Sequence, residues 1–149
     1  AKGFDPSKGN LYLWGPNGAG KTHLAIAILR RWFTRGAAVF VTAGQLIRKA
    51  RMRSPEDEQR VIDEVVQARL VVLDELGPAQ DSPFCRQILQ EILDGRRYQD
   101  RAGLVVTSLL SPQILGRRMG HAAVASRLAA MCEVIEIRPK VTPEGSGRA

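Results

Sequence analysis

The sequence predicts an α/β domain built on a parallel β-sheet with helices on its faces. Short apolar runs alternate along the chain with amphipathic stretches of helical period, which is the order typical of parallel sheets. Most of these runs are continuous in Val, Leu and Ile, as strands buried on both faces require. The length of 149 residues corresponds to one domain with a substantial core.

The expected elements follow one another without internal repeats. The expected strands are Leu11–Trp14, Val39–Thr42, Leu70–Asp74, Leu104–Ser108 and Glu133–Ile137. The expected helices cover about 21–34, 45–52, a stretch opening at 54, 82–97, a short stretch opening at 111, and 121–130. Ser followed by Pro opens the helices at 54, 82 and 111, because Ser can cap a helix N-terminus and Pro fits the first helical position.

The charge and the cysteine content of the chain indicate its partners and its location. The net charge of +7 favours a polyanionic partner, although solubility alone would also account for it. Cys85 and Cys132 lack metal-ligand spacing, so we expect reduced thiols and a cytoplasmic location. No run reads as a membrane span or a signal peptide, and because the chain begins at Ala1 we expect a fragment.

A complete phosphate-binding loop lies between the first strand and the first helix. Its residues are Gly15, Pro16, Asn17, Gly18, Ala19, Gly20, Lys21 and Thr22, with His23 directly after it. The glycines let backbone N–H groups turn inward around a β-phosphate, while Lys21 can reach the β- and γ-phosphates and the Thr22 hydroxyl can hold Mg²⁺. The sequence therefore predicts a nucleoside triphosphate site.

Two acidic residues follow each other at the end of the third expected strand, and an arginine lies on the helix before the fifth strand. Asp74 is expected beside the phosphate loop, where it can orient Mg²⁺ and its waters. Glu75 could polarise the attacking water as a general base, which favours hydrolysis over a solvated acidic strand end. Arg127 could reach the γ-phosphate of a neighbouring subunit as an arginine finger, or it could be an ordinary surface arginine.

Four segments in this order resemble the AAA+ ATPases of the helicase-loader group. That group comprises the bacterial DnaC/DnaI-type replicative helicase loaders and the related IstB-type transposition ATPases. The segments are 15–27 (GPNGAGKTHLAIA), 70–77 (LVVLDELG), the Thr107-Ser108 strand end and Ser126-Arg127-Leu128. They extend over about residues 9–137, which is nearly the whole chain.

The resemblance implies a P-loop NTPase three-layer sandwich without a helical lid, with a five-stranded sheet of order 5-1-4-3-2. We expect residues 1–138 to form the ATPase core, with an N-terminal linker at 1–9. Residues 139–149 are rich in Pro, Gly, Ser and charge, so we expect a loosely ordered tail there. The resemblance further implies that ATP and Mg²⁺ bind at a subunit interface and that the subunits form a spiral or ring-like homo-oligomer. The implied partners are single-stranded DNA and a replicative helicase, which is engaged through a missing N-terminal region. The nearest alternative is a transposition helper that binds duplex DNA.

One departure from the loaders concerns hydrolysis. Loaders usually place Asn after the Thr-Ser that ends the fourth strand, and here that position is Leu109. Thr107 or Ser108 might take over the positioning of water, but slow hydrolysis is the expectation. An ATP-binding DNA-binding module with little hydrolysis therefore stays open. A small-molecule kinase would need an acceptor pocket and an arginine-bearing lid, which the sequence does not show.

The leading DNA contact is the basic segment formed by Arg48, Lys49, Arg51 and Arg53. In initiator-type AAA+ proteins this region holds a helical element that faces the central channel, and the alternative is a solvated helix end. Arg96, Arg97 and Arg101 form a second cluster, which we expect on the surface. Aromatic residues do not interleave with either cluster, so DNA binding should depend on the backbone rather than the bases.

Overall fold

The computed structural model describes residues 4–5, 9–32, 37–51, 54–99 and 103–140. The strands are β1 (Asn10–Trp14), β2 (Ala38–Thr42), β3 (Leu70–Asp74), β4 (Gly103–Ser108) and β5 (Cys132–Glu136). The helices are α1 (Lys21–Trp32), α2 (Ala43–Arg51), α3 (Pro55–Gln67), α4 (Pro83–Arg97), α5 (Pro112–Arg118) and α6 (Ala123–Met131), and η2 (Pro78–Gln80) is a 3₁₀ turn. The alternation of strands and helices is as predicted.

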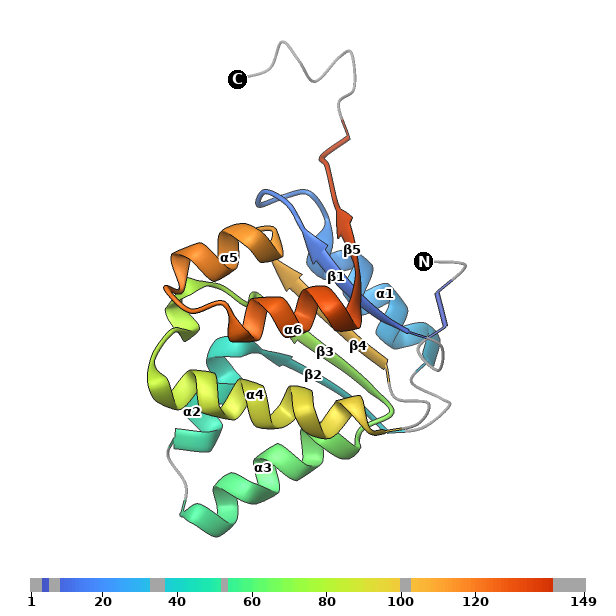
Figure 1. Ribbon diagram of the computed structural model, residues 1–149. Helices are drawn as coiled ribbons and strands as arrows, with labels where there is room; N and C mark the ends of the chain where they lie inside the picture. Colours follow the sequence, from blue (N-terminus) through green and yellow to red (C-terminus); the bar gives the residue numbers. More distant parts are fainter. Residues whose placement is uncertain (1–3, 6–8, 33–36, 52–53, 100–102, 141–149) are drawn as a thin grey trace.

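All neighbouring strands are parallel, and their order across the sheet is β2-β3-β4-β1-β5. Counted from the β5 edge, this is the predicted order 5-1-4-3-2. Helices lie on both faces, with α1 on one side and α4 and α6 on the other (Figure 1). The fold prediction is therefore confirmed, because parallel strands joined by helical crossovers are covered on both faces.

Alternate side chains of each central strand enter different cores, as a period of two requires. Val71 and Leu73 on β3 belong to the larger core, which the helices α2, α3, α4 and α6 cover. Leu70 and Val72 belong to the smaller core, against Ala25 and Ile28 of α1. All five residues of β3 are buried, and the last of them, Asp74, lies at the carboxyl end of the strand.

The Ser-Pro openings are confirmed as helix caps. The side chains of Ser54, Ser82 and Ser111 each accept a hydrogen bond from a backbone N–H in the first turn. The α2 helix begins at Ala43 rather than Gln45, because Thr42 and Gln45 exchange hydrogen bonds of 3.1 Å in a reciprocal cap. Local capping chemistry thus accounts for the starts of these helices.

The expectation that Arg96 lies on the surface is wrong. The residue is only 4% exposed, and its guanidinium donates to the carbonyl oxygens of Val65 (2.7 Å), Ala68 (2.9 Å) and Gly103 (2.5 Å). Burial lowers the pKa of Arg96 from 12.5 to about 10. Arg96 therefore satisfies carbonyls at the end of α3 and fixes α3, α4 and β4 to one another. Arg97 is exposed, as expected, and Arg101 lies outside the described residues.

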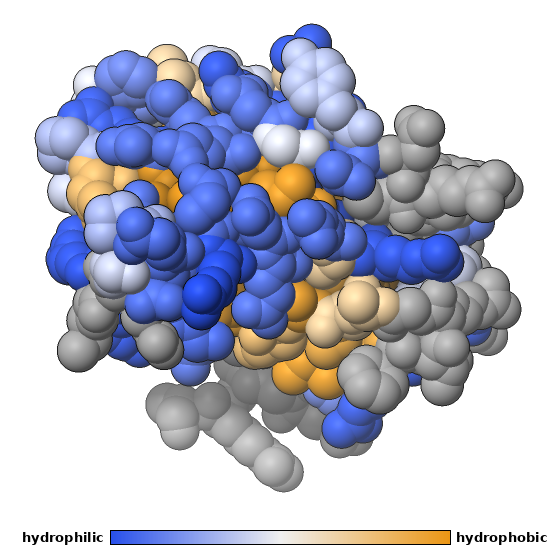
Figure 2. Space-filling model, turned by 90° about the horizontal axis from the view of Figure 1, so that it is seen from below, coloured by the Kyte–Doolittle hydropathy of each residue, from blue (hydrophilic) through white to orange (hydrophobic). Residues whose placement is uncertain are grey.

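Seen from below, the surface is mostly hydrophilic, with hydrophobic side chains visible between the polar ones (Figure 2). In the described ranges no helix is long and apolar enough to cross a membrane. Cys85 and Cys132 are both buried and free. Burial raises the pKa of Cys132 to about 12, so its thiol stays protonated.

Candidate functional site

The root of the phosphate loop is held by both strands that flank β1. The N–H of Gly15 donates to Ser108 at the end of β4 (3.2 Å), and the N–H of Ile137 after β5 donates to Trp14 (2.7 Å). Gly15 has φ +156°, and a Cβ at this position would lie 2.1 Å from the Ile137 oxygen. Only glycine fits there, so the loop leaves the sheet at a fixed point.

Lys21, the first residue of α1, lies beneath this loop and is 9% exposed. Its Nζ donates to the carbonyl oxygens of Gly15 (2.6 Å) and Pro16 (2.8 Å). Burial lowers the pKa of Lys21 below its usual value, and the nearby charges of Asp74 and Glu75 partly oppose that shift. A phosphate would offer Nζ charged acceptors in place of two neutral carbonyls, which strengthens each bond.

Asp74 receives two hydroxyl groups at the end of β3. Thr22 Oγ1 donates to its carboxylate oxygens, at 3.0 Å and 3.2 Å, and Thr107 Oγ1 donates to Oδ1 at 2.5 Å. The side chain of Asp74 is 3% exposed. The structure thus brings together the two residues predicted to hold Mg²⁺. One hydroxyl and one carboxylate fit that ion, which takes few protein ligands beside phosphate oxygens and water.

Glu75 has an unusual backbone for a residue with a side chain. Its φ is +58°, in the left-handed region that favours glycine. The turn is held by Thr107, whose Oγ1 accepts from the Glu75 N–H at 2.9 Å, and by the Leu76 N–H bond to the Thr107 oxygen at 2.9 Å. The side chain of Glu75 is exposed at the same edge as Asp74. Strained residues held in this way cluster at functional sites.

The hydroxyl groups considered as replacements for a polar residue at 109 are already engaged. Thr107 bonds Asp74 and Glu75, and Ser108 Oγ donates to the Leu76 oxygen at 2.7 Å while accepting from the Leu110 N–H at 3.1 Å. Leu109 is 51% exposed beside them. The geometry therefore leaves the slow-hydrolysis hypothesis in place.

Arg127 lies on α6 and reaches across to α4. Its Nη1 donates to Oδ1 of Asp94 in an ion pair, and the two side chains are 39% and 51% exposed. We call the surface around this pair the α4–α6 rim. Arg127 is thus accessible to a neighbouring molecule, as a finger supplied in trans requires.

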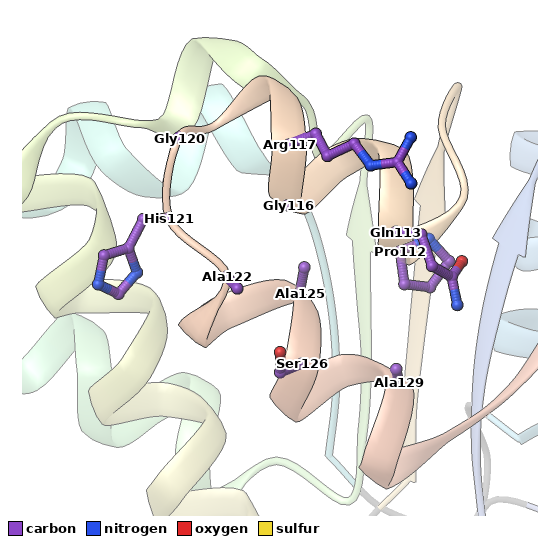
Figure 3. Close-up of a pocket in the computed structure, with 10 residues that line it drawn as sticks. All are labelled: Pro112, Gln113, Gly116, Arg117, Gly120, His121, Ala122, Ala125, Ser126 and Ala129. Carbon is purple, nitrogen blue, oxygen red and sulfur yellow. The ribbon is translucent and has the colours of Figure 1, made fainter.

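A groove of about 440 Å³ lies beside the rim, between α5 and α6. Small residues form much of it, with Arg117 and Gln113 on the α5 side and His121 near α4 (Figure 3). His121 also lines a second, shallower depression together with Asp94. The small side chains leave room for a neighbouring chain to approach the backbone of α6.

The predicted DNA segment lies at the end of α2, and Arg48, Lys49 and Arg51 are exposed there. The guanidinium of Arg51 stacks over the Phe84 ring, 5.2 Å from its centre. Arg53 lies outside the described residues. Arg48 and Lys49 therefore present their charges to solvent, while Arg51 also packs against α4.

A model of the family described as IstB-like ATP binding protein matches residues 3–141. The chain belongs to this family. The strand order and the site geometry agree with that membership, since structural neighbours of the chain are P-loop AAA+ domains.

Relatives of this IstB-like protein include both transposition and replication proteins. An ATP-binding protein of insertion sequence IS5376 from Geobacillus stearothermophilus is 30% identical over 127 residues, which is 84% of this chain and 50% of that protein. The replicative helicase loader DnaC of Escherichia coli is 28% identical over 123 residues, or 78% of this chain and 50% of the loader. The IstB-like chain thus spans about half the length of these relatives.

The solved structures that resemble this chain include replication proteins. A crystal structure of the DnaC helicase loader matches with a TM-score of 0.74 at 26% identity, covering 92% of this chain and 83% of that one. The DnaI structure matches with a TM-score of 0.74 at 25% identity, covering 92% and 78%. The replication initiator DnaA, bound to AMPPCP and single-stranded DNA, has a TM-score of 0.74 at 18% identity over 89% of this chain and 41% of that one, a likeness of fold alone.

Sequence reasoning missed Asp94 entirely and misplaced Arg96. Asp94 is an exposed acidic residue on a polar helix face, and nothing in its spacing indicates that Arg127 lies opposite. Arg96 did carry a signal, because it is three residues beyond Leu93 and seven beyond Leu89, on the buried face of α4. Its charge led to the wrong expectation.

Proposed function

We propose that this IstB-like protein is an oligomeric ATPase that acts on DNA in the cytoplasm, and that it helps to load a replicative helicase. The observation that carries the proposal is the edge of the sheet where Lys21, Thr22, Asp74 and Glu75 meet. It combines a phosphate loop, a metal-binding pair and an exposed carboxylate within one small region.

In the proposed reaction, a water attacks the γ-phosphorus of ATP and the bond from that phosphorus to the β–γ bridging oxygen breaks. Glu75 accepts the proton of the water, and the products are ADP and phosphate. Lys21 donates to the β- and γ-phosphates after its Nζ leaves the Gly15 and Pro16 oxygens. Thr22 and Asp74 would hold Mg²⁺, which when bound neutralises phosphate charge.

Arg127 completes the site of the next subunit in this proposal. It is exposed on α6, so a second copy can bring its γ-phosphate to the guanidinium. ATP then links two subunits, and hydrolysis weakens their contact. Removal of an arginine finger typically lowers turnover by about 10³-fold or more.

DNA is proposed to bind at the end of α2, through the exposed Arg48 and Lys49. The loader role is supported by the solved DnaC and DnaI structures, of which this chain covers 83% and 78%. The helicase itself would be engaged by a region outside the present chain.

A transposition helper that binds duplex DNA is the second candidate. The family match and the IS5376 relative, at 30% identity, favour it. The two candidates share the ATP chemistry and differ in the DNA that stimulates it. Preference for single strands supports the loader, and preference for duplex supports the transposition helper.

The test is ATP turnover measured against protein concentration, with and without each kind of DNA. We expect turnover per subunit to rise with concentration, because each site needs a neighbour. Lys21→Ala and Arg127→Ala subunits should each be inactive alone and partly active when mixed, since the first supplies the arginine and the second the nucleotide. Full turnover by an isolated monomer would contradict the trans role, and ATP binding without any turnover would leave only a binding module.

A further inference from the structure

We propose that Asp94 is a positioning residue for the arginine finger, holding Arg127 at the α4–α6 rim so that it can engage the γ-phosphate of a neighbouring subunit. The inference rests on the proposed trans role of Arg127. It adds to that role a second side chain, on a different helix, which does not itself touch the nucleotide.

The first support is the geometry of the ion pair. Asp94 Oδ1 accepts from Nη1 of Arg127, across the contact between α4 and α6. A guanidinium has five N–H donors in a rigid plane. Among the described residues Arg127 has no other hydrogen-bond partner, so the Nη2 side of its fork stays available for phosphate oxygens.

The second support is the charge around Arg127. The sequences of α5 and α6 contain no Asp or Glu, whereas they contribute Arg117 and Arg118 as well as Arg127. On α4, Glu91 and Asp94 line the same depression as His121. Glu91 accepts from Gln87 at 3.1 Å, along its own helix. Asp94 is therefore the acceptor that fixes where the finger points.

The third support is the rigidity of the helix that carries Asp94. Arg96, two residues further along α4, is buried and bonded to carbonyls from α3, the segment after it and β4. The Asp94 carboxylate is thus exposed but mounted on a fixed backbone. Holding Nη1 of a long, flexible arginine side chain in place lowers the entropy lost when Nη2 binds phosphate.

The experiment uses mixed subunits to locate the effect of Asp94→Asn. Lys21→Ala subunits donate the finger, and Arg127→Ala subunits donate the nucleotide. We expect Asp94→Asn in the finger donor to lower the turnover of the mixture by about three- to tenfold, because the finger is less ordered. The same substitution in the nucleotide donor should leave turnover unchanged, since that subunit has no finger to position. Damage to folding would not distinguish the two placements.

Matched controls come from the same helix. Glu91→Gln removes an equivalent exposed charge one turn away and should not change turnover in either donor. Asp94→Glu keeps the charge and should restore most of the rate. ATP affinity of the nucleotide donor should be the same with and without Asp94→Asn.

Three outcomes would overturn the inference. Asp94→Asn in the finger donor could leave turnover unchanged, or could raise it, which would mean that Asp94 withholds the arginine instead. It could also lower turnover equally in both placements. If the two donors fail to complement before any change at Asp94, the trans role itself is wrong and the positioning role falls with it.

Discussion

The phosphate-loop edge and the α4–α6 rim hold their charged side chains in different ways. At the edge, Lys21 and Asp74 are 9% and 3% exposed. Lys21 donates to two carbonyl oxygens of the phosphate loop, and Asp74 accepts from hydroxyl groups of two separate segments. At the rim, Arg127 and Asp94 are 39% and 51% exposed and bond each other. The buried charges of the edge are paired within the chain, whereas the rim presents a group that a second molecule can reach.

This difference suits the two regions to different tasks, nucleotide binding at the edge and contact with a second subunit at the rim. An exposed ion pair contributes only about 0.2–1 kcal/mol, so the rim can adjust to a second molecule at little cost. The buried groups of the edge are costly to leave unpaired and therefore stay in place until a ligand replaces their partners. One region is suited to holding a nucleotide and the other to sensing a neighbour.

The largest effect should come from breaking the edge with Lys21→Ala. We expect ATP affinity to fall by about 100-fold, because a charge-assisted hydrogen bond contributes about 1.5–3 kcal/mol. Titration calorimetry with ATP and Mg²⁺ would measure the change. Lys140→Ala removes an exposed lysine and serves as the control. Unchanged affinity in Lys21→Ala would show that the edge is not the nucleotide site.

The next effect concerns the support of the rim. Arg96→Met should lower the free energy of unfolding by about 3 kcal/mol, since it leaves buried carbonyls without donors. Chemical denaturation would measure it. Arg97→Met, at the exposed neighbouring position, should change stability by no more than about 0.5 kcal/mol. Equal stabilities for the two variants would mean that Arg96 does not fix α4.

A smaller effect, on ATP turnover, is expected at Leu109, where the edge has an apolar side chain. Leu109→Asn should raise turnover up to about tenfold, because an amide near Glu75 can orient the attacking water. Single-turnover hydrolysis at saturating ATP is the measurement. Ile114→Asn places an amide at another exposed apolar position and should not raise the rate. No gain from Leu109→Asn would contradict the slow-hydrolysis hypothesis.

The smallest effect concerns DNA binding at the end of α2. Binding to DNA should weaken less steeply with salt when Arg48 and Lys49 are replaced with Gln. For single strands, the slope of the logarithm of the binding constant against the logarithm of salt concentration should fall in magnitude by about 1.4, as expected for two lost phosphate contacts. Fluorescence anisotropy at several salt concentrations would measure the slope. The matched change at Arg30 and Arg31, exposed at the end of α1, should alter it less. Similar changes in both double variants would indicate non-specific attraction.

The fold could be predicted from sequence because its signals are local. The apolar run ending at Asp74 reads as a buried strand, and Ser-Pro at 54, 82 and 111 marks helix starts by capping. The 3₁₀ turn Pro78–Gln80 was not predicted, because it depends on the Gln80 side chain accepting from the Gly77 N–H at 2.8 Å. Single turns of this kind leave no periodic pattern.

The site was predictable only in part, because some of its contacts join residues that are not close in the sequence. Lys21, Thr22 and Asp74 belong to contiguous motifs whose meeting follows from the parallel sheet. The pairing of Asp94 with Arg127 joins residues 33 positions apart on two helices, and its existence depends on how those helices pack. The sequence shows which residues are charged but not which of them face each other.

The positive φ of Glu75 has a consequence for how the protein tolerates change. A left-handed backbone costs a residue with a Cβ about 1 kcal/mol, a cost that glycine does not bear. Selection for folding alone would therefore favour glycine at position 75, and the proposed chemistry requires a carboxylate there. Under the proposed function, folding and catalysis make opposite demands on this one residue, and a carboxylate at position 75 is kept at some cost in thermal stability.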